Sequence, residues 1–193
     1  MLAVLLTALA TTAFAGTYQL DTAQSQVLWK AGKKVGSFHN GDVKIKSGSL
    51  ETTKDGSIKS LNVVVDMKTI ASEDWKDSPE YKAKLEGHLS REDFFHVEKF
   101  PEASFELTEI KPAKSKGDYQ VKGKLTIIGN TQPVEFPAKI QFEKESFTGT
   151  ASLEIKRLNW GLKYGSGSIF KSLTADKIIN DSFELTLKLK GKN

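Results

Sequence analysis

The sequence predicts an all-β protein of about eight antiparallel strands, closed as a barrel or as a sandwich around one apolar interior. Apolar and polar residues alternate with a period of two through most of the chain after Gly16, which is typical of strands with one dry and one wet face. Short runs rich in Gly, Asn, Asp and Ser separate these segments and indicate hairpin turns. One charged, aromatic stretch, HLSREDFFHVEKFP at residues 88–101, breaks the alternation.

Each predicted strand shows the alternation separately. In IKSLNVVVDMKTI, for example, Leu61, Val63, Val65 and Met67 fall on one face. Because successive side chains of a strand point to opposite faces, each strand has one face that is suited to burial. The predicted strands lie within residues 18–32, 41–48, 58–70, 103–110, 119–129, 133–143, 146–157 and 182–192.

The inward faces of these strands are rich in Phe, Leu and Val and nearly free of polar anchors. An eight-stranded barrel has an interior that side chains fill or that holds one small ligand. The sequence predicts an apolar interior and leaves open whether it is a lumen or a solid core. The candidate ligand contacts on the strands are Trp29, Val63, Val65, Met67, Phe105, Leu125, Phe136, Ile140, Ala151, Leu153 and Phe183, with Trp160 at the rim.

Two segments interrupt the strands. We interpret residues 72–97 as helix and loop, in which Ser90 and Asp93 have the spacing of a capping box that starts a helix. Residues 161–181 read as a Gly-rich loop with a short helical piece at residues 169–173. We therefore expect one end of the strand array to carry most of the irregular structure.

The N-terminus resembles a secretory signal peptide. Residues 1–15, MLAVLLTALATTAFA, are apolar or small and uncharged, and they end in the small-x-small pattern of Ala13-Phe14-Ala15. This pattern predicts cleavage after Ala15, a single domain at residues 16–193, and a periplasmic or secreted protein. The chain has no Cys, which rules out disulfides and thiolate chemistry.

Charge and motifs argue for binding rather than catalysis. The formal net charge of +4 comes from lysines scattered among acidic residues, which fits a solvated surface, predicts no nucleic-acid partner and is compatible with transient contact with an anionic membrane surface. We predict no metal site, since His88 and His96 do not have the spacing of a metal motif. We also predict no cofactor and no catalytic residues, since no nucleophile lies beside an evident base. Arg157, beside Trp160, is a candidate contact for a phosphate-bearing head group.

Five segments, in the same order, resemble the YceI-like family of exported lipid-binding proteins. They are YQLDTAQSQVLWKA, VVVDMKTIASED, KLEGHLSREDFFHVEKFPEASFELT, YQVKGKLTIIGNTQPVEFPAKI and RLNWGLKYG. Together they extend the resemblance over residues 17–190.

The resemblance implies an eight-stranded antiparallel, lipocalin-like β-barrel with a short helical insert capping one end. It implies that the barrel lumen holds an amphiphilic lipid, such as a polyisoprenoid or an isoprenoid quinone, and that the protein carries or sequesters it. The insert would then cover one end of the barrel, with Phe94 and Phe95 as a plug or gate and His88 near the head group.

Two other functions stay open from the sequence. One is a stress-linked interaction protein with a solid core and no ligand, because the same alternation fits a filled interior. The other is a lipid-modifying enzyme that uses His88, Asp93 and Arg157 at the mouth. The sequence does not distinguish a monomer from a homodimer.

Overall fold

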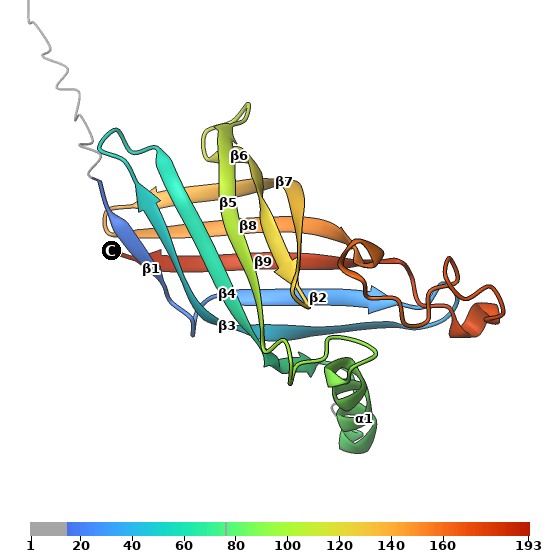
Figure 1. The fold of residues 1–193 in the computed structure, drawn as a ribbon. Helices are drawn as coiled ribbons and strands as arrows, with labels where there is room; N and C mark the ends of the chain where they lie inside the picture. The colour runs from blue at the N-terminus through green and yellow to red at the C-terminus, as the bar shows by residue number, and fades with distance from the viewer. Residues whose placement is uncertain (1–14, 76) are drawn as a thin grey trace, which may run out of the picture.

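The computed structural model describes residues 15–75 and 77–193. Apart from Ala15, the predicted signal peptide lies outside the described residues, so its cleavage site stays a prediction. The described part consists mainly of strands, with one helix set at one end (Figure 1). The elements are β1 (Thr17–Leu20), β2 (Gln26–Gly32), β3 (Phe38–Thr52), β4 (Ile58–Ser72), α1 (Pro79–Ser90), β5 (Glu102–Pro112), β6 (Asp118–Ile127), β7 (Asn130–Glu143), β8 (Ser146–Lys156), η1 (Arg157–Trp160), η2 (Ala175–Lys177) and β9 (Ser182–Lys192).

The nine strands form an eight-stranded closed antiparallel barrel, because β1 and β2 occupy one position in the wall. Both strands pair with β3 on one side and with β9 on the other. Between them the Asp21 carboxylate accepts hydrogen bonds from the backbone N–H groups of Ala23 and Gln24, a turn that interrupts the strand. The β3–β4 pairing closes the ring. The predicted barrel is therefore confirmed, and the sandwich alternative is wrong.

The two ends of the barrel differ. The α1 end carries α1 with the turns after it, the β2–β3 and β6–β7 turns, and the long segment between β8 and β9. The β1 end carries the chain termini of the barrel and the β3–β4, β5–β6 and β7–β8 turns. Figure 1 shows α1 and the segment before β9 gathered at the α1 end, as expected for the irregular segments.

Bulges adapt the long strands β3 and β4 to the curved wall. In β3, Val43 and Ile45 are buried, and further along Leu50 and Thr52 are buried instead of the odd-numbered positions. The register between β3 and β4 shifts between Ile45 and Ser47. An extra residue in one strand moves the inward set by one position and bends the strand, so both halves of β3 keep an apolar face toward the interior.

The helix lies earlier in the insert than the capping-box interpretation placed it. The helix α1 begins at Pro79, a residue whose fixed φ and missing N–H suit the first turn. It ends at Ser90, whose hydroxyl donates a hydrogen bond to the carbonyl of Glu86. The Ser90–Asp93 prediction was therefore wrong, because Ser90 ends the helix and Asp93 lies in the turns that follow.

The segment between β8 and β9 is mostly turns, with two short 3-10 helices. The predicted helical piece at residues 169–173 is wrong, since these residues form turns and the helical turn η2 lies at Ala175–Lys177. The buried Arg157 ties this segment to the barrel. Its guanidinium donates to the carbonyls of Asn180, Leu162 and Ile179, which fixes both ends of the loop.

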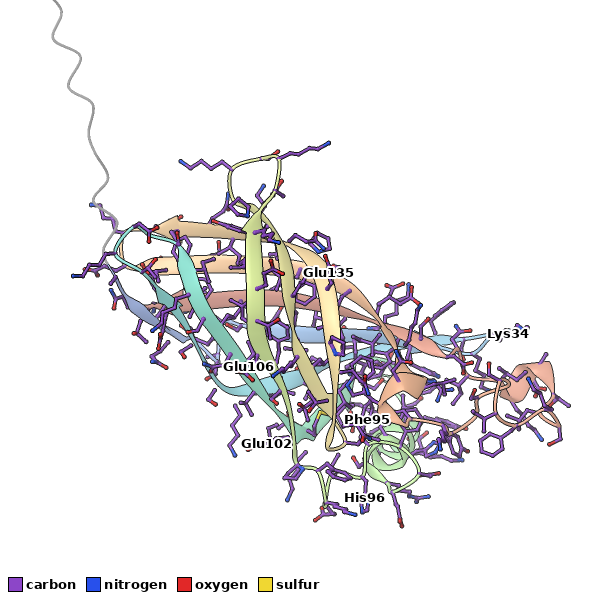
Figure 2. All side chains as sticks on the ribbon, turned by 45° about the horizontal axis from the view of Figure 1, so that its top comes forward. Lys34, Phe95, His96, Glu102, Glu106 and Glu135 are labelled. Carbon is purple, nitrogen blue, oxygen red and sulfur yellow. The ribbon has the colours of Figure 1, made fainter. Side chains whose placement is uncertain are left out.

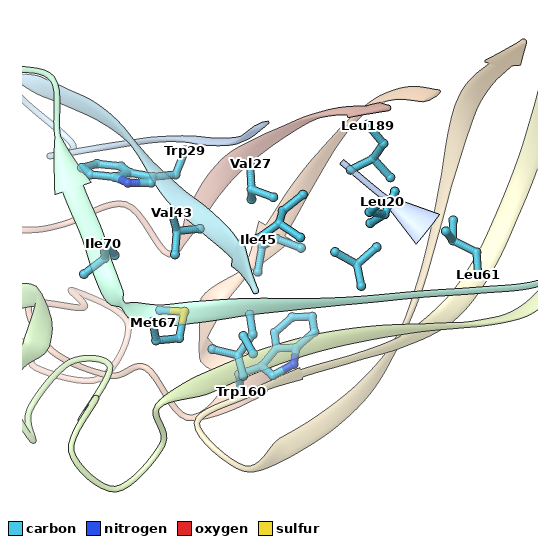
Figure 3. Packing of buried hydrophobic residues seen from close by; sticks show 14 of the residues in the cluster. Leu20, Val27, Trp29, Val43, Ile45, Leu61, Met67, Ile70, Trp160 and Leu189 are labelled. Atoms are coloured by element: carbon cyan, nitrogen blue, oxygen red, sulfur yellow. The ribbon is translucent and has the colours of Figure 1, made fainter. Parts of the chain in front are cut away.

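The core is the inner surface of the barrel wall. Figure 3 shows Val27, Trp29 and Val43 together with Met67 and Ile70 on the inner face of the neighbouring strands β2, β3 and β4. Phe147 and Ile155 on β8 are both 1% exposed. The packing is not complete, since an apolar cavity remains between these side chains.

Candidate functional site

The barrel contains an internal cavity, the lumen, with a volume of about 180 Å³. It extends from Leu50 and Phe147 near the β1 end to Phe94, Phe95 and Asn180 at the α1 end. An apolar cavity of about 150 Å³ stays dry and accepts a ligand the size of benzene, whereas drug-sized ligands occupy roughly 300–1,000 Å³. The lumen as seen here is therefore smaller than the usual ligand pocket, and because it extends between the two ends of the barrel it suits a slim chain.

The inward residues predicted from the sequence form most of the lumen wall. Thirteen of the fourteen candidate contacts lie around the lumen, eleven of them on strands and two in the turns after α1, Trp160 being the exception, and Arg157 of η1 also lies there. As ligand contacts these residues stay a prediction, but the convergence of the strand residues on one cavity follows from the alternation. The thirteen residues are Trp29, Val63, Val65, Met67, Phe94, Phe95, Phe105, Leu125, Phe136, Ile140, Ala151, Leu153 and Phe183.

Among the described residues, Trp29 is the one whose side chain has a buried polar atom without a hydrogen-bond partner. Its side chain is buried, at 9% exposure, and among the described residues nothing accepts a hydrogen bond from its indole Nε1. It lies close to Gly41 of β3, where a Cβ atom would come within 2.7 Å of the indole ring. A buried N–H without an acceptor is costly, and no side chain of the described wall offsets that cost.

Aromatic side chains lie at the α1 end of the lumen. Phe94 and Phe95, in the turns after α1, line the lumen with their ring centroids 5.3 Å apart. The ring of His88 lies 5.7 Å from Phe94 and 4.6 Å from Tyr164. These contacts join the insert to the segment before β9 (Figure 2, where Phe95 is labelled), so the aromatic side chains at this end come from two separate parts of the chain.

His88 lies outside the lumen wall. Its Nε2 is 3.4 Å from the Asp93 carboxylate, and its side chain is 31% exposed. Of the three residues of the enzyme hypothesis, the structure therefore brings His88 and Asp93 together. The third, Arg157, is held by other partners, the backbone carbonyls of the segment before β9. Among the described residues no three His, Asp or Glu side chains are grouped so that they could hold a metal ion.

Arg157 lines the lumen, but its guanidinium is already engaged. Besides the three carbonyls it lies 3.5 Å from the carboxylate of Asp181. Burial lowers the pKa of Arg157, and Asp181 opposes that shift. Burial also acts to raise the pKa of Asp181, but hydrogen bonds from Ser166 and Ser168 and the charge of Arg157 bring it below its ordinary value. The pair is arranged to hold the loop, and an incoming head group would compete with these partners.

Trp160 lies at the α1 end of the barrel, as predicted, but it does not line the lumen. It is buried, its indole N–H donates to the carbonyl of Leu125 at 2.9 Å, and its own carbonyl accepts from Asn130 at 2.8 Å. These contacts connect the end of β8 to the β6–β7 hairpin across a seam. Along that seam β7 and β8 pair only from Ala138↔Ala151 to Glu143↔Ser146, and residues 130–137 pair with β6 alone.

Sequence reasoning missed lumen residues of the segment before β9. Leu162, Ile179 and Asn180 line the lumen at the α1 end. They lie outside any alternating stretch, so no periodic signal marks them. Only the position of Arg157 at the end of a strand pointed to this part of the chain.

Comparisons with known proteins agree with this architecture. A UPF0312 protein of Pseudomonas putida (strain W619) is 29% identical over 174 residues, which is 85% of each chain. The structure of BcnA from Burkholderia cenocepacia matches with a TM-score of 0.71 at 22% identity, covering 89% of this chain and 98% of that one. A polyisoprenoid binding domain from Saccharophagus degradans matches with a TM-score of 0.64 at 15% identity, covering 94% and 99%. At these identities the two structures establish the fold.

A match to a model of a protein family assigns this chain to a family. The YceI-like domain matches residues 18–191, which runs from β1 to the end of β9 and includes the insert and the segment before β9. The resemblance found in five separate segments is thus confirmed over the whole barrel. The chain belongs to the YceI-like family.

Proposed function

We propose that this protein binds an amphiphilic lipid in the barrel lumen and carries or sequesters it in the periplasm. The observation that carries the proposal is the lumen, which is enclosed by apolar side chains from all parts of the wall. Burial of an apolar chain there would contribute about 25 cal/mol per Å² before the costs of ordering. The similarity of the fold to a polyisoprenoid binding domain supports the same ligand class, and the predicted signal peptide supports export.

The proposal favours binding over chemistry. Among the described residues of the lumen wall, Arg157 is the only ionisable one, and it is held by the loop before β9. General acid–base or nucleophilic catalysis needs a titratable group within reach of the ligand. A lipid in the lumen would meet hydrocarbon walls along nearly its whole length, which suits storage or transfer.

The shape of the lumen narrows the ligand class. A cavity of about 180 Å³ favours a flexible chain of small cross-section, such as a prenyl or acyl chain. The N–H of Trp29 favours a ligand with an acceptor oxygen near one end of the chain. An isoprenoid quinone, with carbonyl oxygens at the end of a prenyl chain, fits both features, and a polyisoprenoid alcohol or phosphate also provides an oxygen.

Native mass spectrometry tests the proposal. The protein is purified from the periplasm of its own source without detergent, weighed intact, and then extracted with organic solvent. We expect a bound species whose mass follows a prenyl or acyl series. An unliganded protein with no lipid in the extract would contradict the proposal and favour an interaction protein without cargo.

A pair of β8 variants tests whether the lipid is bound in the lumen. Gly149 lines the lumen, and a Cβ atom there meets its nearest neighbour, the Cβ of Leu189, at an ordinary 3.7 Å. Gly149→Leu therefore fills the lumen without a backbone clash, and we expect at least about tenfold less bound lipid. Thr148→Leu adds an apolar side chain on the exposed outer face of the same strand and should leave the lipid content unchanged. Equal lipid in both variants would show that the lipid is held elsewhere.

A further inference from the structure

At the α1 end, part of the chain projects beyond the barrel, and we call this part the distal tip. It consists of residues 30–38, around the β2–β3 turn, and residues 165–178 of the segment before β9. Figure 2 shows this part, with Lys34 labelled, extending beyond the barrel on the right. Four large apolar side chains of the tip are exposed: Val35 and Phe38 at 59%, Ile169 at 47% and Phe170 at 46%. Exposed large apolar side chains gathered in one part of a molecule mark interaction surfaces.

Backbone hydrogen bonds hold the two parts of the tip together. Lys33 forms an isolated antiparallel bridge with Ile179. The N–H of Lys34 donates to the carbonyl of Ile178 at 2.8 Å, and the N–H of Asn180 donates to the carbonyl of Gly32 at 2.9 Å. The two segments that carry the exposed apolar side chains are therefore joined to each other and are not independent loops.

The tip is strongly basic. Five exposed lysines lie on it, and Asp176 is the one acidic residue within residues 30–38 and 165–178. The pKa of Asp176 lies below its ordinary value, chiefly because Thr174 donates a hydrogen bond to it, and Lys177 and Lys33 act in the same direction. The ammonium group of Lys30 lies 5.2 Å from the ring centroid of Phe38. The lysines are Lys30, Lys33, Lys34, Lys171 and Lys177.

The tip adjoins the lumen. Ile179 and Asn180 bind the β2–β3 turn through their backbones, and both also line the α1 end of the lumen. Whatever the tip rests on therefore lies next to the end of the lumen at which the aromatic side chains lie. A projecting surface of apolar side chains surrounded by lysines fits the interface of a bilayer with anionic head groups, where apolar groups enter the acyl boundary and lysines face phosphates.

We propose that the distal tip docks on the surface of an anionic lipid bilayer, with Val35, Phe38, Ile169 and Phe170 inserted between head groups. A second copy of the chain would place these lysines against equal charges, which disfavours self-association through the tip. Docking would set the lumen against the membrane that supplies or receives the lipid. The docking itself does not depend on the lipid-carrier proposal, since it involves only the outside of the barrel.

Vesicle flotation tests the docking. The purified protein is mixed with vesicles of phosphatidylcholine alone and of phosphatidylcholine with phosphatidylglycerol. We expect flotation with the anionic vesicles, reduced at ionic strength of about 1 M, where the Debye length falls to about 3 Å. The double variant Val35→Ser/Phe170→Ser should bind anionic vesicles about tenfold more weakly, and so should Lys33→Glu/Lys34→Glu.

The control variants distinguish the tip from the rest of the surface. Phe142→Ser removes an apolar side chain that is 38% exposed at the β1 end, and it should float as the unchanged protein does. The proposal is overturned if the unchanged protein does not float with anionic vesicles, if the tip variants float equally well, or if sedimentation shows a dimer that the tip variants convert to a monomer. Gly149→Leu should still float, so loss of lipid cargo and loss of docking are separable results.

Discussion

Single residues of the lumen wall were predictable where they belong to a strand. Val63, Val65 and Met67 fall on one face because alternate residues of a strand point the same way, and the structure places all three on the lumen. Trp160 shows the limit of this reasoning. It follows the last alternating residue of β8, and its two hydrogen bonds reach a hairpin about 30 residues earlier in the chain, a contact that no local pattern encodes.

Trp29 allows a prediction about ligand choice. Trp29→Phe removes the indole N–H while keeping an aromatic side chain in the wall. We expect the affinity for an isoprenoid quinone to fall by about five- to tenfold, because one hydrogen bond contributes about 1 kcal/mol. The affinity for squalene, a hydrocarbon without an acceptor, should change little.

The comparison of the two ligands provides its own control. Competition for a fluorescent lipid probe measures both affinities on the same preparations of protein. If Trp29→Phe weakens quinone and squalene by the same factor, the indole acts through packing, and the idea of a hydrogen bond to the ligand is wrong.

At the level of elements, strands were predicted better than the segments between them. The alternation located all the long strands, but it did not reveal that β1 and β2 share one position, because the interruption at residues 21–25 depends on a local turn at Asp21. The helix was placed too late because Ser90 suits the end of a helix as well as its start. Residues 161–181 show no periodic alternation of apolar and polar residues, and the path of this segment is fixed by the hydrogen bonds of Arg157.

The Arg157 contacts predict a measurable loss of stability. Arg157→Lys keeps the charge but replaces the planar guanidinium, which reaches three carbonyls, with a single ammonium group. We expect the free energy of unfolding in urea to fall by about 2 kcal/mol. Lys156→Arg, at the exposed neighbouring position, should change it by less than about 0.5 kcal/mol. Equal stabilities of the two variants would show that the segment before β9 is held by other contacts.

At the scale of the whole molecule, the sequence could not choose between a barrel and a sandwich. Both need strands with one apolar face, and the choice depends on pairings between distant strands such as β2 with β9. The family resemblance resolved this choice correctly, since it compares the whole order of segments rather than one period. The cavity could not be predicted from the sequence either, because the apolar face of a strand does not specify how completely side chains from opposite parts of the wall fill the interior.

Removal of the lipid should lower the stability of the whole barrel. A ligand that binds only the folded state stabilises it by about 2.7 kcal/mol at a concentration 100 times the Kd. For a chain of this size, that corresponds to a fall in Tm of roughly 5–10 °C after delipidation. Calorimetry before and after extraction measures the change, and adding the extracted lipid back should restore it. A Tm that is the same with and without the lipid would show that the lipid is not held by the folded barrel.

The seam between β7 and β8 has a consequence for how much the barrel can hold. β8 is joined to β9 by eleven residue pairs but to β7 by six. Residues 130–137 of β7 can therefore move away from β8 without loss of any ladder hydrogen bond between these strands, and two hydrogen bonds of Trp160 bridge the seam at the α1 end. Along this part of the seam the wall is held by side chains rather than by ladder hydrogen bonds. We expect the width of the barrel there to depend on side-chain packing and on Trp160, so that the same barrel can close on a thin chain and widen for a thicker one.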